Sequence, residues 1–108
     1  MKARFNSKKL SVVIPCYNED TTLAELVDRV VNADTCGLDL EVLIVNDAST
    51  DGSAEIAKSI ASNDSRIVFE QHTINLGKGA ALRTGFKKAT GDIVMVQDSD
   101  LEYSPSDY

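Results

Sequence analysis

Two aspartates one residue apart, Asp98 and Asp100, follow an apolar segment at residues 92–96. A D-x-D turn directly after a strand directs two carboxylate oxygens toward nearly one place, which is the hard-oxygen environment that Mg²⁺ or Mn²⁺ requires. Taken alone the signal is weak, because a polar turn that closes a buried strand has the same sequence. The pair therefore predicts a divalent-cation site only if other segments supply partners for it.

Other acidic residues also follow apolar segments, and four of them are Glu19, Asp47, Asp51 and Glu102. If these segments are parallel strands, the carboxylates gather with the D-x-D pair at one edge of the sheet. Like charges that lie close together raise one another's pKa and repel, so a bound cation would offset the cost. Each residue also has a simpler interpretation: Asp51 as the N-cap of a helix, and Glu19 as a solvated loop residue.

Lys78 stands between Gly77 and Gly79 at the expected start of a helix. Free N–H groups and the positive end of the helix dipole, together with this lysine, are suited to a phosphate or a ribose. A Walker P-loop is excluded, because His72 occupies its first glycine position and Gly79 its Ser/Thr position. The alternative is that the glycines only shape a turn and that the lysine is solvated.

The single histidine and the two cysteines carry little signal for chemistry. His72 has no cysteine or second histidine at ligand spacing, so we expect a surface or loop residue. Cys16 and Cys36 lack zinc-like or redox spacing, which favours free thiols in a reducing compartment. Cys16 has no base partner near it in the sequence, and no nucleophilic role is assigned to it.

Four apolar segments of strand length must position these residues, at 10–15, 40–45, 66–70 and 92–96. They are rich in Val and Ile and apolar on both faces, as in strands that helices cover on both sides. Helical patterns separate them, which predicts an α/β fold with a parallel sheet and right-handed crossovers. Ligands of such sheets bind outside the carboxyl ends of the strands. All the candidate residues follow a strand and are therefore expected to share that edge.

Three apolar stripes at helical spacing define the expected helices. Their members are Leu23, Leu26, Val27, Val30 and Val31, then Ile56, Ala57, Ile60 and Ala61, and finally Leu82, Phe86 and Ala89. Thr22 and Glu25 form a potential capping box, and Asp20 or Thr21 is an alternative cap. Gly91 is expected at the C′ position of the third helix.

Length and charge narrow the class of protein. A chain of 108 residues with 43% apolar and 26% charged residues fits one globular domain. We assign residues 10–108 to it and 1–9 to a basic leader. A net charge of −6 argues against general nucleic-acid binding, which depends on Lys and Arg.

No segment has the length of a membrane span, and the first apolar run is too short for a signal peptide. We expect a cytoplasmic location.

Four segments in order, "VVIPCYNED", "VLIVNDASTDGS", "NLGKGAALRTGFKKATGD" and "VMVQDSDLEYSP", resemble the family 2 glycosyltransferases of GT-A fold. The resemblance covers nearly everything from residue 10 onward. It is strongest to the branch that resembles dolichyl-phosphate mannose synthase and bacterial polyprenyl-phosphate glycosyltransferases. It implies a Rossmann-like, nucleotide-sugar-binding half, a divalent cation (Mg²⁺ or Mn²⁺) and inversion at the anomeric carbon of the sugar.

The resemblance also implies roles for individual residues. Tyr17 would lie near the base, Glu19 near the ribose, and Asp47 would accept a hydrogen bond from the ring N–H of the base. Asp98 and Asp100 would hold the metal. With Lys78 added, the predicted nucleotide-sugar-binding set is Pro15, Tyr17, Asn18, Glu19, Asp47, Lys78 and Asp98.

Two positions depart from the family pattern. Many relatives have Asp where this chain has Asn46, and the mannose-synthase branch often has Gln where it has Glu102. The first change leaves the base contact at Asp47, and the second weakens assignment to any one donor.

The predicted function is transfer of a sugar from a UDP- or GDP-sugar to a polyprenyl-phosphate or saccharide acceptor, in cell-wall or polysaccharide biosynthesis and at the cytoplasmic membrane face. In this family the acceptor residues and any general base lie beyond the D-x-D motif. The chain, which ends at Tyr108, is therefore expected to be a donor-binding half that is inactive alone. Its fourth strand would lie near an uncovered edge and invite self-association.

Three other classes of protein share part of this pattern. A nucleotide-sugar or metal-binding module without transferase activity fits the same residues. A response regulator needs a phosphoacceptor aspartate after the third strand, and "RIVFEQHT" has none. Sugar-nucleotide pyrophosphorylases need a glycine-rich loop after the first strand, which this chain lacks.

Overall fold

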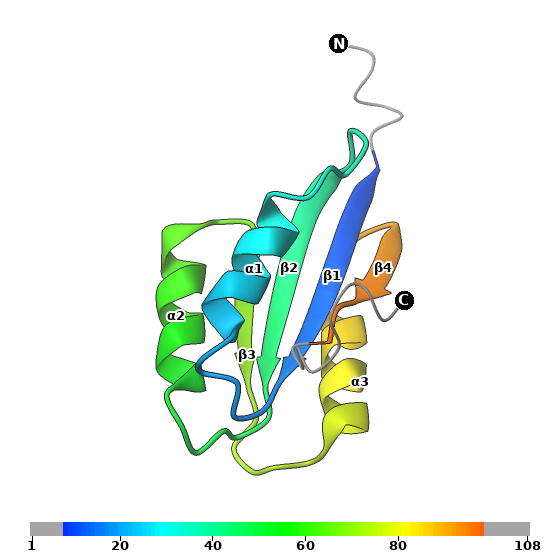
Figure 1. The fold of residues 1–108 in the computed structure, drawn as a ribbon. Coiled ribbons are helices and arrows are strands. Elements are labelled where there is room, and N and C mark those ends of the chain that lie inside the picture. The colour runs from blue at the N-terminus through cyan, green and yellow to red at the C-terminus, as the bar shows by residue number, and fades with distance from the viewer. Residues whose placement is uncertain (1–7, 99–108) are drawn as a thin grey trace, which may run out of the picture.

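A computed structural model describes residues 8–98 of the chain. Four parallel strands form one sheet in the order β3-β2-β1-β4, with three helices packed on it (Figure 1). This confirms the α/β fold predicted from the sequence. The elements are β1 (Lys9–Cys16), α1 (Leu23–Val31), β2 (Asp39–Asn46), α2 (Ser53–Asn63), β3 (Ile67–Gln71), α3 (Lys78–Lys88) and β4 (Ile93–Val96).

The alternation of side chains along the two central strands divides the core between the two faces of the sheet. Val12, Ile14 and Cys16 of β1 pack with the apolar stripes of α1 and α2. Val13 of β1 packs on the opposite face against α3, where Ala81 is buried. The helices therefore cover both faces of β1 and β2, as the apolar strands predicted, and their stripes on α1 and α2 are confirmed.

The register brings three strand ends level at one edge. Cys16 at the end of β1 pairs with Asn46 at the end of β2, and Asn46 pairs with Gln71 at the end of β3. β4 ends earlier, because Val96 pairs with Val13. The chain continues alongside β1 for at least one more residue, since the Gln97 N–H donates to the Val13 carbonyl at 2.9 Å.

The edge strand β4 differs from the other three strands. All four of its residues, Ile93–Val96, are exposed in the described part of the chain. The expectation that helices cover every strand on both faces is therefore wrong for β4, whereas its edge position agrees with the prediction. The reason is topological: α3 packs mainly on β1 and β2 and leaves the residues of β4 exposed.

The helix termini differ from the predicted caps. Thr22 is the N-cap of α1 but makes no side-chain cap hydrogen bond, so the capping box is wrong. Asp20 instead accepts the N–H of Gly52 at 3.1 Å, and thus joins the loop after β1 to the start of α2. Asp51 accepts the N–H of Ser53, the first residue of α2, at 2.9 Å. The N-cap of α2 is Gly52, however, so the prediction of Asp51 as the N-cap is wrong by one residue.

The predicted stripe of α3 is confirmed at Leu82 and Ala89, which are partly buried against the core, but not at Phe86. Ala81 and Gly85 are buried, whereas Phe86 is 49% exposed. The small residues face the sheet because the helix lies very close to β1. A Cβ added at Gly85 would lie 2.3 Å from Cγ1 of Val13. Apolar size alone, which selected Phe86, misses a helix face built from small residues.

Gly91 also has a different role from the predicted one. The C-cap of α3 is Ala89, with an extended backbone, so Gly91 is not its C′ residue. Instead the chain passes so close to β1 that a Cβ at Gly91 would lie 2.5 Å from the Ser11 hydroxyl oxygen. The Gly91 N–H donates to that hydroxyl at 2.8 Å.

A buried carboxylate fastens the approach to β4 at the amino end of the sheet. Glu41 accepts hydrogen bonds from the Ser11 hydroxyl at 2.7 Å and from the Thr90 N–H at 3.0 Å. Burial raises the pKa of Glu41, but the hydrogen bonds from Thr90 and Ser11 outweigh burial and hold it below its usual value. Within residues 8–98, no helix is both long and apolar enough to span a bilayer.

Candidate functional site

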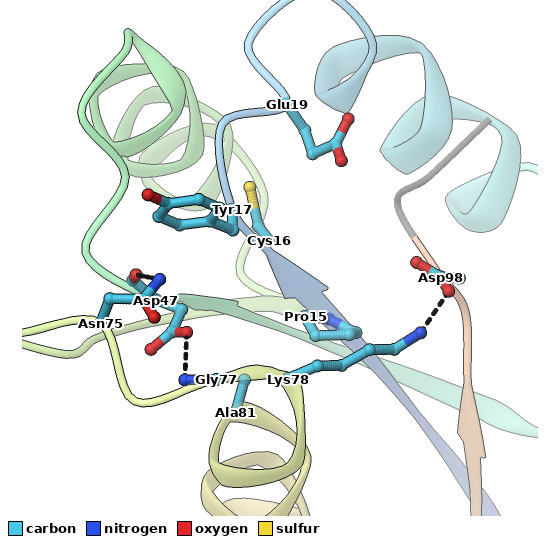
Figure 2. A pocket seen from close by; sticks show the side chains of 10 residues that line it. All are labelled: Pro15, Cys16, Tyr17, Glu19, Asp47, Asn75, Gly77, Lys78, Ala81 and Asp98. Atoms are coloured by element: carbon cyan, nitrogen blue, oxygen red, sulfur yellow. Dashed lines mark hydrogen bonds and ion pairs between the residues drawn. The ribbon is translucent and has the colours of Figure 1, made fainter. Parts of the chain in front are cut away.

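A cavity of about 420 Å³ opens at the carboxyl ends of the strands (Figure 2). The loop after β1, the end of β2, the loop before α3, the first turn of α3 and the residues after β4 all contribute to its wall. Its lining residues are Pro15, Cys16, Tyr17, Glu19, Asp47, Asn75, Gly77, Lys78, Ala81 and Asp98. Six of the seven residues predicted to bind a nucleotide sugar therefore lie around one opening; the seventh, Asn18, is not among the lining residues.

Asp47 lies at one end of the cavity and is almost completely buried, with 3% of the residue exposed. Its Oδ1 accepts the N–H of Leu76 at 2.9 Å, and its Oδ2 accepts the N–H of Gly77 at 2.8 Å. Asn75 donates from its side chain to the Asp47 carbonyl at 3.2 Å. The end of β2 therefore holds the whole turn that leads into α3.

The electrostatics of Asp47 run opposite to the expectation for a crowded acidic edge. Burial raises the pKa of Asp47, but the hydrogen bonds from Leu76, His72 and Gly77 outweigh burial and lower it below its usual value. The pKa of Asp51 is lowered in the same way, by hydrogen bonds to Ser53 and Asp20 that outweigh burial. Both carboxylates are therefore ionised at neutral pH, because the hydrogen bonds that they accept stabilise the charged form.

His72 is part of this arrangement: it lies in the loop after β3, as predicted, but its side chain is largely buried and not on the surface. Its side chain is 10% exposed. Nδ1 lies 2.8 Å from Oδ1 of Asp47, and Nε2 lies 2.8 Å from the Thr84 hydroxyl of α3. Metal-ligand spacing was the wrong criterion for this residue. Its place directly after β3, level with Asp47 after β2, was the signal that could have found it.

Hydrogen bonds from the loop after β2 support the loop after β1. Asn18 adopts a left-handed conformation with φ 54°, which asparagine tolerates better than most residues. Its side-chain oxygen accepts the Thr50 N–H at 2.8 Å, and its own N–H donates to the Ser49 hydroxyl at 2.9 Å. Asn18 thus supports the loop, while its neighbour Tyr17 is 45% exposed and extends over the cavity (Figure 2).

Lys78 and Asp98 lie at the other end of the cavity and form an ion pair. Their side chains are 57% and 47% exposed, so this end is open to solvent. Asp98 is the last described residue, and the predicted metal ligand Asp100 and the departure at Glu102 lie outside the described residues. Among residues 8–98, no three Asp, Glu, His or Cys side chains gather closely enough to hold a metal ion.

Cys16 lines the cavity but has no nucleophilic character. It is 1% exposed, and burial raises the pKa of its thiol despite a hydrogen bond with Ser53 that lowers it. A raised pKa keeps the thiol neutral, and the neutral form is a poor nucleophile. Both Cys16 and Cys36 are free thiols, as predicted.

The structure is thus an open parallel α/β sheet with a cavity at the carboxyl ends of its strands, which is where ligands of such sheets bind. Residues 11–108 match the profile of glycosyl transferase family 2, and the chain belongs to that family. This agrees with the resemblance found in the four sequence segments.

Among curated proteins, the chain is 39% identical over 102 residues to the undecaprenyl-phosphate 4-deoxy-4-formamido-L-arabinose transferase of Salmonella typhimurium. The match covers 93% of this chain and 31% of that protein. The chain thus spans about a third of the length of the curated relatives that it matches.

Two solved structures share the fold. The mannosyltransferase PcManGT of Pyrobaculum calidifontis, in complex with GDP-Man and Mn²⁺, has a TM-score of 0.75 and 31% identity over 87% of this chain and 28% of its own. TarS 1-349 of S. aureus, in complex with UDP-GlcNAc, has a TM-score of 0.73 and 29% identity over 85% of this chain and 26% of its own. The sheet is therefore that of the GT-A glycosyltransferases.

Proposed function

We propose that this chain is the donor-binding part of a glycosyltransferase that transfers a sugar, with inversion, from a nucleoside-diphosphate sugar to a polyprenyl-phosphate or saccharide acceptor. The observation that carries the proposal is the two-ended cavity. One end presents a buried, ionised acceptor at Asp47, and the other presents Lys78 and Asp98. A nucleoside diphosphate has matching ends, because its base carries ring N–H donors and its diphosphate is anionic.

The base end supports discrimination between ligands. A buried carboxylate that meets a base without a donor would stay unpaired at that position, which is costly. Asp47 therefore favours bases with a ring N–H, and both uracil and guanine have one. Tyr17 extends over the same end of the cavity and offers a ring face for stacking (Figure 2). Glu19 lies on the same loop, where we assign it to the ribose.

The diphosphate end fits a divalent cation. Asp98 contributes hard carboxylate oxygens at the cavity wall, which suit Mg²⁺ or Mn²⁺, and we assign Asp100 as its second ligand from the sequence. A cation bound there supplies Lewis-acid stabilisation of the leaving nucleoside diphosphate. Lys78 would then exchange its partner Asp98 for a phosphate oxygen, at the N-terminus of α3 where the helix dipole also favours an anion.

The acceptor is inferred from the curated relatives. The curated relatives are named for undecaprenyl phosphate, a lipid-linked acceptor, which favours a polyprenyl phosphate over a saccharide and a reaction at the cytoplasmic membrane face. An anionic lipid phosphate needs no general base, whereas a saccharide hydroxyl does. No catalytic base is assigned among the described residues, and we attribute acceptor binding to other parts of the full-length protein.

Calorimetric titration of the chain with UDP-sugars and GDP-sugars, with and without Mn²⁺, tests the donor site. We expect one nucleotide class to bind, Mn²⁺ to strengthen that binding, and Asp98→Ala to abolish the Mn²⁺ effect. Absence of metal-dependent binding to every donor, or binding untouched by Asp98→Ala, would contradict the proposal. Nucleotide-sugar binding together with no transfer by the full-length protein to any acceptor would favour the alternative, a binding module without transferase activity.

A further inference from the structure

Asp47 has a hydrogen-bonding pattern that treats its two oxygens unequally. Oδ1 accepts two donors, the Leu76 N–H at 2.9 Å and His72 Nδ1 at 2.8 Å. Oδ2 accepts one, the Gly77 N–H at 2.8 Å. A carboxylate oxygen has about two lone-pair positions, so Oδ1 is saturated and Oδ2 keeps one for a further donor.

The protonation of His72 follows from its neighbours. Asp47 is ionised and cannot donate, so Nδ1 must carry a proton and donate it to Oδ1. Nε2 lies 2.8 Å from the Thr84 hydroxyl, which can act as donor or acceptor and so suits the tautomer that Asp47 requires. The imidazole is thus held at both nitrogens between β2 and α3, and its side chain is 10% exposed.

From this geometry we propose that His72 is a positioning residue for donor recognition: it occupies Oδ1 of Asp47 and thereby orients Oδ2 for the ring N–H of the nucleotide base. The inference rests on the proposed function, because it assigns Asp47 to the base. Thr84 serves the same purpose one step further away, since its hydroxyl bonds to Nε2 and holds the imidazole in its orientation.

The same contacts make the positioning geometrically strict. Asp47 is joined by its carboxylate to Leu76 and Gly77, the two residues directly before α3, and Thr84 lies on α3 itself. Rotation of the Asp47 carboxylate would break its hydrogen bonds to the Leu76 and Gly77 N–H groups at once. His72 adds a further donor to Oδ1 from the loop after β3, so its loss leaves the carboxylate held by the Leu76 and Gly77 N–H groups alone.

Calorimetry on the chain, with whichever nucleoside diphosphate the wild type binds, tests the inference. His72→Leu removes both ring nitrogens and should weaken nucleotide binding about tenfold, the loss expected for one hydrogen bond to a charged group. His72→Asn places an amide donor near the position of Nδ1 and should restore most of the affinity. Thr84→Val should give a smaller loss, and Thr84→Ser should show none.

A purely structural role would change different quantities. We expect the factor by which Mn²⁺ strengthens nucleotide binding to remain at the wild-type value in His72→Leu, because the diphosphate end is intact. General damage to the cavity would reduce that factor together with the affinity. Combining His72→Leu with Asp47→Asn should cost no more affinity than Asp47→Asn alone, since His72 acts through Asp47.

Each outcome bears on a different statement. Wild-type affinity in both His72→Leu and Thr84→Val, with Asp47→Asn impaired, would overturn the role of His72 and leave the donor site standing. A loss that His72→Asn does not restore, with a reduced Mn²⁺ factor, would also overturn it in favour of a structural role. No nucleotide binding by the folded wild-type chain would overturn the proposed function and, with it, this inference. If His72→Leu does not fold, the Thr84 pair gives the decision.

Discussion

The two ends of the cavity are built in different ways. At the base end, Asp47 is buried, and its carboxylate is held by donors from the loop after β3 and from the residues before α3. At the diphosphate end, the side chains of Lys78 and Asp98 are about half exposed and form an ion pair next to the exposed strand β4. The base end is thus part of the fold, whereas the diphosphate end can exchange partners at little cost to the fold.

This difference separates recognition from chemistry. A preorganised acceptor such as Asp47 selects a ligand because it does not adapt to the wrong one. A lysine and a carboxylate that neutralise each other at the surface contribute little to stability, so they can be reassigned to a phosphate and a cation. A substitution at the Asp47 end should therefore lower the stability of the fold strongly. A substitution at the Lys78–Asp98 end should change binding with little effect on stability.

Asp47→Ala should have the largest effect on stability. It leaves the Leu76 and Gly77 N–H groups and His72 without their acceptor, and each buried unpaired group costs about 1–3 kcal/mol. We expect a total loss of about 3 kcal/mol in the free energy of unfolding, measured by urea denaturation. Asp98→Ala is the matched control, with an expected change below about 0.5 kcal/mol. Equal losses in the two variants would contradict the comparison.

Gly85→Ala tests the packing that brings α3 to the base end. The new Cβ would meet Cγ1 of Val13 at 2.3 Å, so the helix must move away from β1. Overpacking of this kind costs about 1–3 kcal/mol. The control is Gly79→Ala in the same helix, where the nearest atom is 3.6 Å away. It should be neutral or stabilising by up to about 1 kcal/mol. Thermal unfolding of both variants decides, and a stable Gly85→Ala variant would show that α3 is not held this tightly.

Acid should remove the contribution of Asp47 to stability. The pKa of Asp47 is lower in the folded chain than its ordinary value of 3.8, so its contribution to stability is fully present above that value. It is lost as the pH falls through the lower folded pKa. We expect stability, followed by urea denaturation at several pH values, to decline below about pH 4. The slope should be shallower in Asp47→Asn, and an unchanged slope would show that Asp47 is not held ionised by its donors.

The exposed pair of Asp64 and Arg66 should show the smallest effect on stability, although its electrostatic signature is clear. The hydrogen bonds and charge of Arg66 lower the pKa of Asp64 to about 2, and both side chains are partly solvated. NMR titration of the Asp64 carboxyl should give a midpoint near that value, and Arg66→Ala should return it toward 3.8. Asp64→Ala should leave the unfolding midpoint unchanged within error. A clear destabilisation would show that exposed pairs contribute more here than the comparison assumes.

Much of the fold was predictable because β1 and β2 are apolar on both faces and the intervening stripes have helical spacing. The cavity was predictable for the same reason, since parallel strands bring Tyr17, Asp47 and Asp98 to one edge. The small-residue face of α3 was not, because Gly85 carries no apolar signal and Phe86 does. The role of His72 was also missed, because its ring contacts Asp47 and Thr84, which are both distant from it in the sequence. The roles of Asp47 and Asp98 in binding remain predictions.

The most direct test is a crystal structure of the chain with its nucleoside diphosphate and Mn²⁺, using the anomalous signal of manganese to locate the ion. Our account predicts an anomalous peak beside the Asp98 carboxylate and a base ring N–H within hydrogen-bond distance of Oδ2 of Asp47. A peak remote from Asp98, or a base bound away from Asp47, would contradict it.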